Sequence, residues 1–321
     1  MRKTLILSRA ELEAIATMPM ALNAVEFAFR AMAEGTAEMP PKVYLSLPEH
    51  DGDFRAMPAR LGDTVGLKWV NSHPRNPERH GLPSVLGLYV LSDPATALPL
   101  AIMDGTSLTA LRTGAAAGVA SRALARRESS SLGLVGAGVQ AEYFLRAHRE
   151  VFPELSVSVS DIDDARAREF AKRHGVNAVS TEESAGSDVV CIATPSRTPV
   201  LTHDMIKPGT HINAMGADAP GKQELESAIL EHARVFVDEL EQARHSGEIN
   251  VPLHAGTYSV DAIAGTVGEV IAGQKSARTS DQDITVFDST GLAVQDLALA
   301  SRVFEAAGER GVRLDLVGLE R

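Results

Sequence analysis

A lysine stands in the middle of an apolar run. Residues 65–70 read VGLKWV, so Lys68 lies between Leu67 and Trp69, the only tryptophan of the chain. Lysine side chains are seldom fully buried without a partner. Either the stem lies along a strand while the ammonium group reaches water, or the fold needs an amine in a dry pocket. In a dry pocket the pKa of the amine falls below about 10.4, unless a carboxylate holds it charged.

The clearest local motif is GAGVQA, over residues 136–141. It follows an apolar run that predicts a strand, and it opens a stretch with helical periodicity. Gly136 allows a tight turn, Gly138 lets the backbone approach a pyrophosphate, and Ala141 fills the third small position. Asp161 ends the next predicted strand, at the place where an acid binds the ribose of a dinucleotide. The arrangement predicts a dinucleotide site.

Asp161 also indicates which nicotinamide cofactor binds. Its carboxylate can accept hydrogen bonds from ribose hydroxyls and would repel a 2′-phosphate, so NAD(H) is expected rather than NADP(H). Arg166 and Arg168 follow closely and weaken this preference. Other lining residues are expected at the carboxyl ends of later strands, where open α/β sheets bind ligands. These are residues 194–196 with Thr194, residues 213–216, Asp218 and residues 288–291, although turns and helix caps use the same residue types.

Composition excludes several classes of protein. The 321 residues include 31 Lys and Arg against 42 Asp and Glu, a formal net charge of −11 that argues against a nucleic-acid binder. No run of about 18 apolar residues predicts a membrane span, and the first residues do not resemble a signal peptide. Cys191 is the only cysteine, and the histidines, His73 among them, are scattered. We therefore expect a cytoplasmic protein with no metal site.

The rhythm of apolar residues predicts an α/β fold with two domains. Residues 9–34 have helical spacing, with Ser8 as a cap and Glu11 three positions on. Short β-like runs between residues 40 and 103 predict a mixed sheet, and residues 107–126 predict a helix rich in small residues that packs closely on a neighbour. From residue 130 strands and helices alternate, which indicates βαβ units and a mostly parallel sheet. A last helix is expected over residues 292–309.

Eight segments in order resemble the ornithine cyclodeaminase/mu-crystallin family, and within it the archaeal-type alanine dehydrogenase branch. The resemblance covers nearly the whole chain. The segments are PPKVYL (40–45), FRAMPA (54–59), GLKWVNSHP (66–74), LRTGAA (111–116), GAGVQAE (136–142), INAMGADAPGKQEL (212–225), GEIN (247–250) and FDSTGLAVQD (287–296).

The resemblance implies a homodimer with two domains. Residues 1–113, with about 300–321, would form a mixed α+β domain for dimerisation and substrate binding. Residues 114–299 would form a Rossmann domain that binds NAD(H). The family's catalytic lysine and aspartate match Lys68 and Asp218, and its substrate-carboxylate contacts match Lys42 and Arg112. The family's dinucleotide contacts match Ser84, Thr113, Val139, Gln140, Asp161, Thr194, Ala214, Met215, Lys222 and Ser289.

These residue types suit hydride transfer between an amino acid and its imine. The substrate carboxylate needs cations, which the Arg112 fork and the ammonium groups of Lys42 and Lys68 can supply. A proton must also move on or off nitrogen or water, which suits the Asp218 carboxylate. The competing interpretations are a water-exposed Lys68, an Arg112 that caps a helix or pairs with a surface acid, and an Asp218 that only forms a turn.

One position departs from the cyclodeaminase pattern. Arg55 stands where those enzymes have a glutamate that receives the distal amino group of ornithine, and a second cation would repel such a substrate. We therefore expect an NAD(H)-dependent amino acid dehydrogenase or imine reductase acting on a small 2-oxo acid, with Arg55 as a further carboxylate contact. The alternatives are an ornithine cyclodeaminase, a cyclic ketimine reductase and, more remotely, a non-catalytic crystallin-like binding protein.

Overall fold

The computed structural model describes residues 3–316 and 318 and divides the chain into two units. Unit 1 comprises the described residues up to Arg112 together with those from Leu292 onward, and unit 2 comprises Thr113–Gly291. The sequence-based division assigned residues 292–299 to the dinucleotide domain. In the structure they belong to unit 1, because helix α12 (Ala293–Ala306) packs there against α2 (Met18–Ala33) and strand β4 (Gly52–Leu61).

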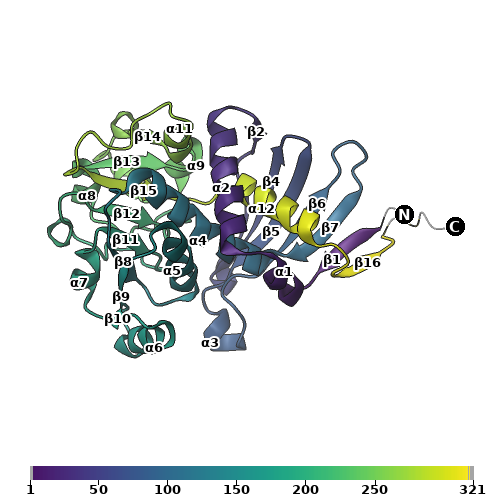
Figure 1. Ribbon diagram of the computed structural model, residues 1–321, viewed down its shortest axis with the longest axis horizontal. Helices are drawn as coiled ribbons and strands as arrows, with labels where there is room; N and C mark the ends of the chain where they lie inside the picture. Colours follow the sequence, from purple (N-terminus) through teal and green to yellow (C-terminus); the bar gives the residue numbers. More distant parts are fainter. Residues whose placement is uncertain (1–2, 317, 319–321) are drawn as a thin grey trace. The chain divides into compact units, whose positions relative to one another are not determined.

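Unit 1 is built on an eight-stranded mixed sheet (Figure 1). The strand order is β16-β1-β7-β6-β5-β4-β2, with β3 also paired to β4. Among the described strands of this sheet, only β1 and β7 pair in parallel. Apart from β4, the strands are β1 (Thr4–Leu7), β2 (Ala37–Glu38), β3 (Val43–Leu47), β5 (Thr64–Ser72), β6 (Gly87–Ser92), β7 (Pro99–Asp104) and β16 (Val312–Leu314).

The sequence between residues 9 and 34 forms two helices rather than one. The first begins after Ser8, whose hydroxyl and backbone exchange hydrogen bonds with Glu11, so the predicted cap is confirmed as a capping box. Thr17 caps the second helix, and Pro19 lies in its first turn, where a missing N–H costs nothing. These stop and start signals explain the break. Besides α2 and α12, unit 1 contains α1 (Arg9–Ile15), η1 (Pro48–His50) and α3 (Asn76–His80).

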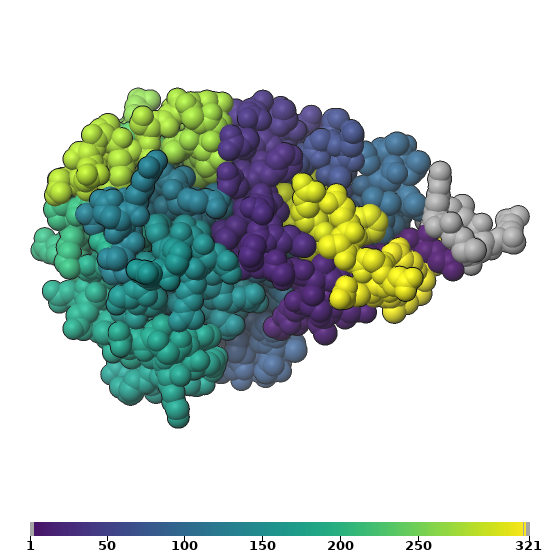
Figure 2. Space-filling model, viewed as in Figure 1, coloured from purple at the N-terminus to yellow at the C-terminus, as the bar shows by residue number. Residues whose placement is uncertain are grey.

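The first and last helices of unit 1 lie side by side. Helix α12 contacts α2 and crosses β4, β5 and β6, and Figure 2 shows the yellow C-terminal atoms next to the purple N-terminal atoms. Burying a large apolar side chain such as Phe29 of α2 contributes about 1.5–3 kcal/mol to the free energy of unfolding. No single helix within residues 3–316 is long and apolar enough to cross a membrane, and the bent pair α1 and α2 passes only by length and composition.

Helix α4 (Gly105–Leu124) runs through the division between residues 112 and 113. The predicted close packing of its small residues is confirmed in unit 2. A Cβ added at Gly114 would lie 2.6 Å from the backbone oxygen of Tyr143 on α5 (Val139–Val151). Only glycine allows these two helices to approach so closely.

Unit 2 is built on a fully parallel sheet with helices between its strands (Figure 1). The order is β10-β9-β8-β11-β12-β15-β13-β14. From β8 the chain adds β9 and β10 on one side and then crosses to add β11 and β12 on the other side. Doubly wound dinucleotide-binding folds reverse their strand order in the same way. Strands such as β11 and β15 are buried along their whole length, which explains their unbroken apolar runs.

The strands of unit 2 are β8 (Ser131–Val135), β9 (Ser156–Ser160), β10 (Asn177–Ala178), β11 (Val189–Ile192), β12 (His211–Ala214), β13 (Ala233–Val237), β14 (Gly265–Thr266) and β15 (Ile284–Asp288). Its other helices are α6 (Asp164–His174), α7 (Thr181–Ala185), η2 (His203–Met205), α8 (Ser227–His232), α9 (Leu240–His245), α10 (Asn250–His254), η3 (Val260–Ala262) and α11 (Val267–Ile271).

Candidate active site

Lys68 is buried, with 1% of its surface exposed. It lies in a row of opposite residues that runs from Met57 on β4 through Lys68 to Tyr89 on β6 and Met103 on β7. This row faces the interior of unit 1, whereas its strand neighbour Trp69 faces outward and is 43% exposed. The hypothesis of a lysine whose amine reaches water is therefore wrong.

The amine of Lys68 is paired with a carboxylate that comes from the other end of the chain. Its Nζ donates a hydrogen bond to Asp296 Oδ2 over 2.6 Å, across 228 residues of sequence. Arg112 Nε donates to the other oxygen of Asp296 over 3.0 Å, and its Nη1 donates to Gln295 Oε1 over 3.3 Å. One buried carboxylate on α12 thus holds a cation from β5 and a cation from α4.

The charges of this cluster do not cancel. The pKa of Lys68 is lowered to about 7. Burial lowers it most, Asp296 partly offsets this by raising it, and the charges of Arg112 and Lys42 also lower it. When Lys68 is protonated, Lys68 and Arg112 together carry one positive charge more than Asp296 neutralises. Two of the three guanidinium nitrogens of Arg112 contact α12. A second carboxylate would balance this surplus charge.

Arg55 lies on the same face of the sheet as Lys68, since it stands opposite Val70 in the register of β4 and β5. Its guanidinium makes two hydrogen bonds to Asp53, from Nε over 2.7 Å and from Nη2 over 3.0 Å. It also lies 5.2 Å from the centre of the Tyr44 ring. Arg55 was expected to be an uncompensated cation, but Asp53 neutralises its charge.

The expected dinucleotide contacts lie at the ends of neighbouring parallel strands in unit 2. Asp161 follows β9, Gly136 follows β8, and Thr194 comes just after β11. Ala214 ends β12, with Met215 next, and Ser289 follows β15. Because β9, β8, β11, β12 and β15 are adjacent in this order and parallel, their carboxyl ends meet along one edge.

The turn after β8 fits a dinucleotide. Gly136 has φ +96°, a conformation that side-chain-bearing residues rarely adopt. Gly138 precedes the first residue of α5, Val139, which is exposed, and a Cβ at Gly138 would meet no atom within 4 Å. The protein's own packing does not require glycine there, so the open space suits a ligand close to the helix N-terminus. Gln140 Oε1 is buried and has no hydrogen-bond partner within the described residues.

Two carboxylates on this edge are already engaged. Asp161 accepts hydrogen bonds from the backbone N–H groups of Ala137, over 2.8 Å, and Asp163, over 2.9 Å. This fixes its carboxylate against the glycine-rich turn. Asp218 forms an ion pair of 2.6 Å with Lys222. Asp218 was expected to act in catalysis and Lys222 to contact the cofactor, so the two expected roles meet in one pair.

Three further expected contacts have defined places. The hydroxyl of Ser289 lies 3.3 Å from Asp238, which also binds the backbone of the following residues. Thr113 is buried in α4. Ser84, in unit 1, accepts the backbone N–H of His73 over 2.7 Å. The predicted role of His73 as a loop histidine fits this position.

Comparison with known proteins identifies the family. The sequence profile of the ornithine cyclodeaminase/mu-crystallin family matches residues 2–311. The chain belongs to this family. An alanine dehydrogenase of Archaeoglobus fulgidus is 50% identical over 315 residues, 97% of each chain.

Solved structures of family members agree with the fold. An archaeal alanine dehydrogenase dimer with bound NAD is 49% identical, with a TM-score of 0.94 over 98% of this chain and 99% of that chain. The Δ1-pyrroline-2-carboxylate reductase of Thermococcus litoralis, in complex with NADH and L-proline, is 36% identical. Its TM-score is 0.92, over 98% of this chain and 100% of that chain. Unit 2 of the present chain is thus a Rossmann-type domain, as expected.

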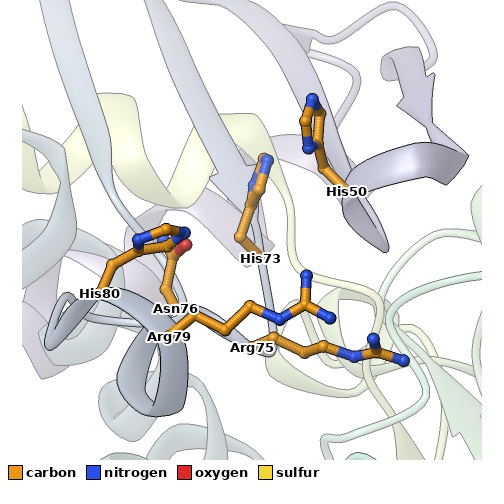
Figure 3. A pocket seen from close by; sticks show the side chains of 6 residues that line it. All are labelled: His50, His73, Arg75, Asn76, Arg79 and His80. Carbon is orange, nitrogen blue, oxygen red and sulfur yellow. The ribbon is translucent and has the colours of Figure 1, made fainter.

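A basic pocket lies in unit 1. Figure 3 shows the side chains that line it. Its volume is about 210 Å³, and Arg75 on its wall pairs with Asp51 over 2.6 Å. The lining residues are His50, His73, Arg75, Asn76, Arg79 and His80. None of them is an expected site residue. Among residues 3–316 and 318, no group of three or more His, Cys, Asp or Glu side chains is arranged to hold a metal ion.

Sequence reasoning missed three residues of unit 1. Asp296 and Gln295 bind Lys68 and Arg112, and Asp53 binds Arg55. A signal for Asp296 was present, because it is an acid within the apolar helix LAVQDLALA, as Lys68 is a base within an apolar strand. Two isolated opposite charges in apolar runs are candidates for a buried pair.

We predict that Asp296→Asn lowers the free energy of unfolding by about 3–5 kcal/mol, because it leaves two buried cations without their carboxylate. Urea unfolding near pH 7 measures this. The loss should be larger at about pH 6 than at about pH 8, since Lys68, with a lowered pKa, can give up its proton at the higher pH.

The matched control is Glu169→Gln, which breaks the exposed pair between Glu169 and Arg173 on α6. It should cost at most about 1 kcal/mol. If Asp296→Asn cost no more than this control, the buried ion pair would not have the role assigned to it.

Proposed function

We propose that this protein is an NAD(H)-dependent oxidoreductase that interconverts a small 2-oxo acid and the corresponding L-amino acid. The observation that carries the proposal is the buried cluster in which Lys68 and Arg112 share Asp296. A carboxylate bound beside Arg112 would balance the surplus positive charge. The similarity to alanine dehydrogenases supports a substrate as small as pyruvate.

Besides the 2-oxo acid, the reaction needs only ammonia and NADH. A 2-oxo acid condenses with ammonia and loses water to form an imine, and the imine carbon then gains a hydride while nitrogen gains a proton. The nicotinamide, when bound, supplies that hydride and becomes NAD⁺. Residues at the carboxyl edge of the unit 2 sheet, Gly136, Gly138 and Gln140 among them, would hold it.

The protein's own residues would bind the substrate and move protons. Arg112 would hold the substrate carboxylate with its planar fork. Lys68, with a pKa near 7, can polarise the carbonyl when charged and accept a proton when neutral. Asp218, whose side chain is 35% exposed, is paired with Lys222, and water can reach its carboxylate.

The test is NADH oxidation, followed by absorbance, with pyruvate and ammonium at saturating concentrations. Wild type should turn over, and Lys68→Met should lose about a hundredfold or more in kcat/KM. Lys172→Met, which removes an exposed lysine on α6, serves as the control and should keep wild-type activity. Equal activity of Lys68→Met and wild type would contradict the role of Lys68.

A second candidate is the reduction of a cyclic 2-imino acid such as Δ1-pyrroline-2-carboxylate. Asp53 neutralises Arg55, so β4 presents no uncompensated cation that would repel a larger substrate. This pairing favours the second candidate. NADH oxidation by the cyclic imine without ammonium, and none with pyruvate, would select it. Release of ammonia from ornithine with NAD⁺ in catalytic amounts would instead select a cyclodeaminase.

We predict that the enzyme prefers NADH and that Asp161→Asn reduces this preference about tenfold, because the variant no longer repels a 2′-phosphate. The measurement is the ratio of kcat/KM values for NADH and NADPH. Asp164→Asn removes an exposed charge three positions away and should leave the ratio unchanged. An unchanged ratio in Asp161→Asn would show that Asp161 does not select the cofactor.

The chain should form a homodimer through the outer face of the unit 1 sheet. A cross-strand row there joins Val43, Ala56, Trp69 and Leu88, and Leu88 is 54% exposed. Contiguous exposed apolar residues mark interaction surfaces, and a two-fold dimer buries one such patch against its copy. The solved archaeal relative is a dimer.

Light scattering should therefore give a dimer mass for wild type. Trp69→Glu should shift the protein to monomer, because two like charges would face each other in a symmetric interface. Phe27→Glu, at an exposed position of α2, is the control and should stay dimeric. A dimeric Trp69→Glu would exclude this face.

We further propose a cytoplasmic location, which the single and buried Cys191 supports, since a reducing compartment suits unpaired thiols. Cell fractionation with an antibody against the protein would test it, and recovery in an extracellular fraction would refute it.

A further inference from the structure

Three acids of unit 2 are fully buried, and only one of them, Asp288, lies in a segment that was expected to line the cofactor site. Glu224, Glu248 and Asp288 each have 0% of their surface exposed. Burial raises the pKa of Glu224 and of Asp288 to about 7, and that of Glu248 well above its ordinary value. Apolar residues would fill these places at lower cost, so the acids must provide something that packing does not.

The three acids are linked in the order Asp288, Glu248, Glu224, because the side chain of each of the first two binds the backbone of the acid that follows it. Asp288, at the end of β15, accepts the N–H groups of Glu248, over 2.8 Å, and Ile249, over 3.2 Å. Glu248 accepts the N–H groups of Glu224 and Leu225, both over 2.9 Å. The three side chains therefore form a connected series from β15 to the segment after β12.

The series ends at the edge where the cofactor contacts lie. Glu224 accepts the N–H of Thr194 over 2.5 Å and the N–H of Gly216 over 2.7 Å. One carboxylate thus ties the segment after β11 to the segment after β12. Gly216 is two residues before Asp218, and its carbonyl oxygen accepts the N–H of Asp218 over 2.9 Å.

Two glycines make room for these acids. A Cβ at Gly216 would lie 2.4 Å from the Glu224 carboxylate, and one at Gly247 would lie 2.5 Å from that of Asp288. Gly247 also has φ +94°, and its N–H donates to Ala217, next to Asp218. The backbone is therefore shaped to bring the carboxylates against it.

We propose that Glu224, supported by Glu248 and Asp288, is a positioning residue that holds the Asp218 segment and the Thr194 segment in register for the reaction. The inference rests on the proposed function of Asp218 as the group that moves a proton. Glu224 touches neither substrate nor cofactor in this scheme. It acts through the backbone that carries the residues that do.

The first test measures the backbone directly. In Glu224→Gln an amide N–H replaces one acceptor, so the two N–H groups can no longer both be satisfied. Hydrogen exchange at Thr194 and Gly216, followed by mass spectrometry, should become about tenfold faster or more. This readout does not require substrate or NADH, and it decides the proposal even if the enzyme fails to oxidise NADH with every substrate tried.

The matched control is Asp188→Asn. Asp188 also binds backbone N–H groups, those of Ser130 and Ser131, but at the opposite edge of the same sheet, where β8 and β11 begin. Asp188→Asn should speed exchange at Ser130 and Ser131, leave Thr194 and Gly216 unchanged, and keep the wild-type kcat.

The second test is kinetic. Glu224→Gln should lower kcat about tenfold or more while the KM for the 2-oxo acid changes little, because the cations that bind the substrate belong to unit 1. In an Asp218→Asn background, Glu224→Gln should cause a smaller further loss of kcat than it does in wild type, since its effect through Asp218 is already lost. Losses that multiply, or unchanged exchange at Thr194 and Gly216, would overturn the proposal.

If Glu224→Gln does not fold, Asp288→Asn provides the same comparison from the other end of the series. It should raise exchange at Glu248 and, to a smaller extent, at Gly216. Faster exchange confined to Glu248 and Ile249 would show that the three acids do not act together, and would also overturn the proposal.

Discussion

The buried carboxylate of Asp296 is the interaction on which unit 1 depends. Lys68 and Arg112 are buried, and Lys68 lies between the buried Met57 and Tyr89 of the neighbouring strands, where an unpaired cation is very costly. Their partner comes from the last helix of the chain, 228 and 184 residues away. The C-terminal segment must therefore return to the first unit, and the division of the chain at Leu292 follows from this need.

The same ion pair fixes the rotation of α12. All eight residues from Ala293 to Ala300 are buried and six of them are apolar, so packing alone distinguishes poorly between rotations of the helix. A shift by one residue turns an α-helix by roughly 100°, which would direct Asp296 away from both cations. Hydrophobic burial holds the helix on the sheet, and the charges determine which of its faces meets Lys68.

Local features of the fold could be predicted from the sequence, whereas contacts between distant side chains could not. The Ser8 capping box, the parallel sheet and the close packing at Gly114 follow from patterns within a few residues. The break between α1 and α2 was missed because the apolar period continues through it. Only Thr17 and Pro19 mark the place where the second helix begins. The residues bound to Lys68 and Arg55 were missed because a residue type does not reveal which distant charge it meets.

The two units bury their charges by different means, and the difference matches what each must do. In unit 1 opposite side chains pair, which leaves surplus positive charge and a lysine whose pKa is near 7, so the cluster can respond to an anion. In unit 2 the buried acids are satisfied by backbone N–H groups, which have fixed geometry and no titration of their own. Side-chain pairing suits a site that binds and exchanges protons. Backbone pairing suits a frame that has to keep several strand ends in register, because moving one acid would break hydrogen bonds in two segments at once.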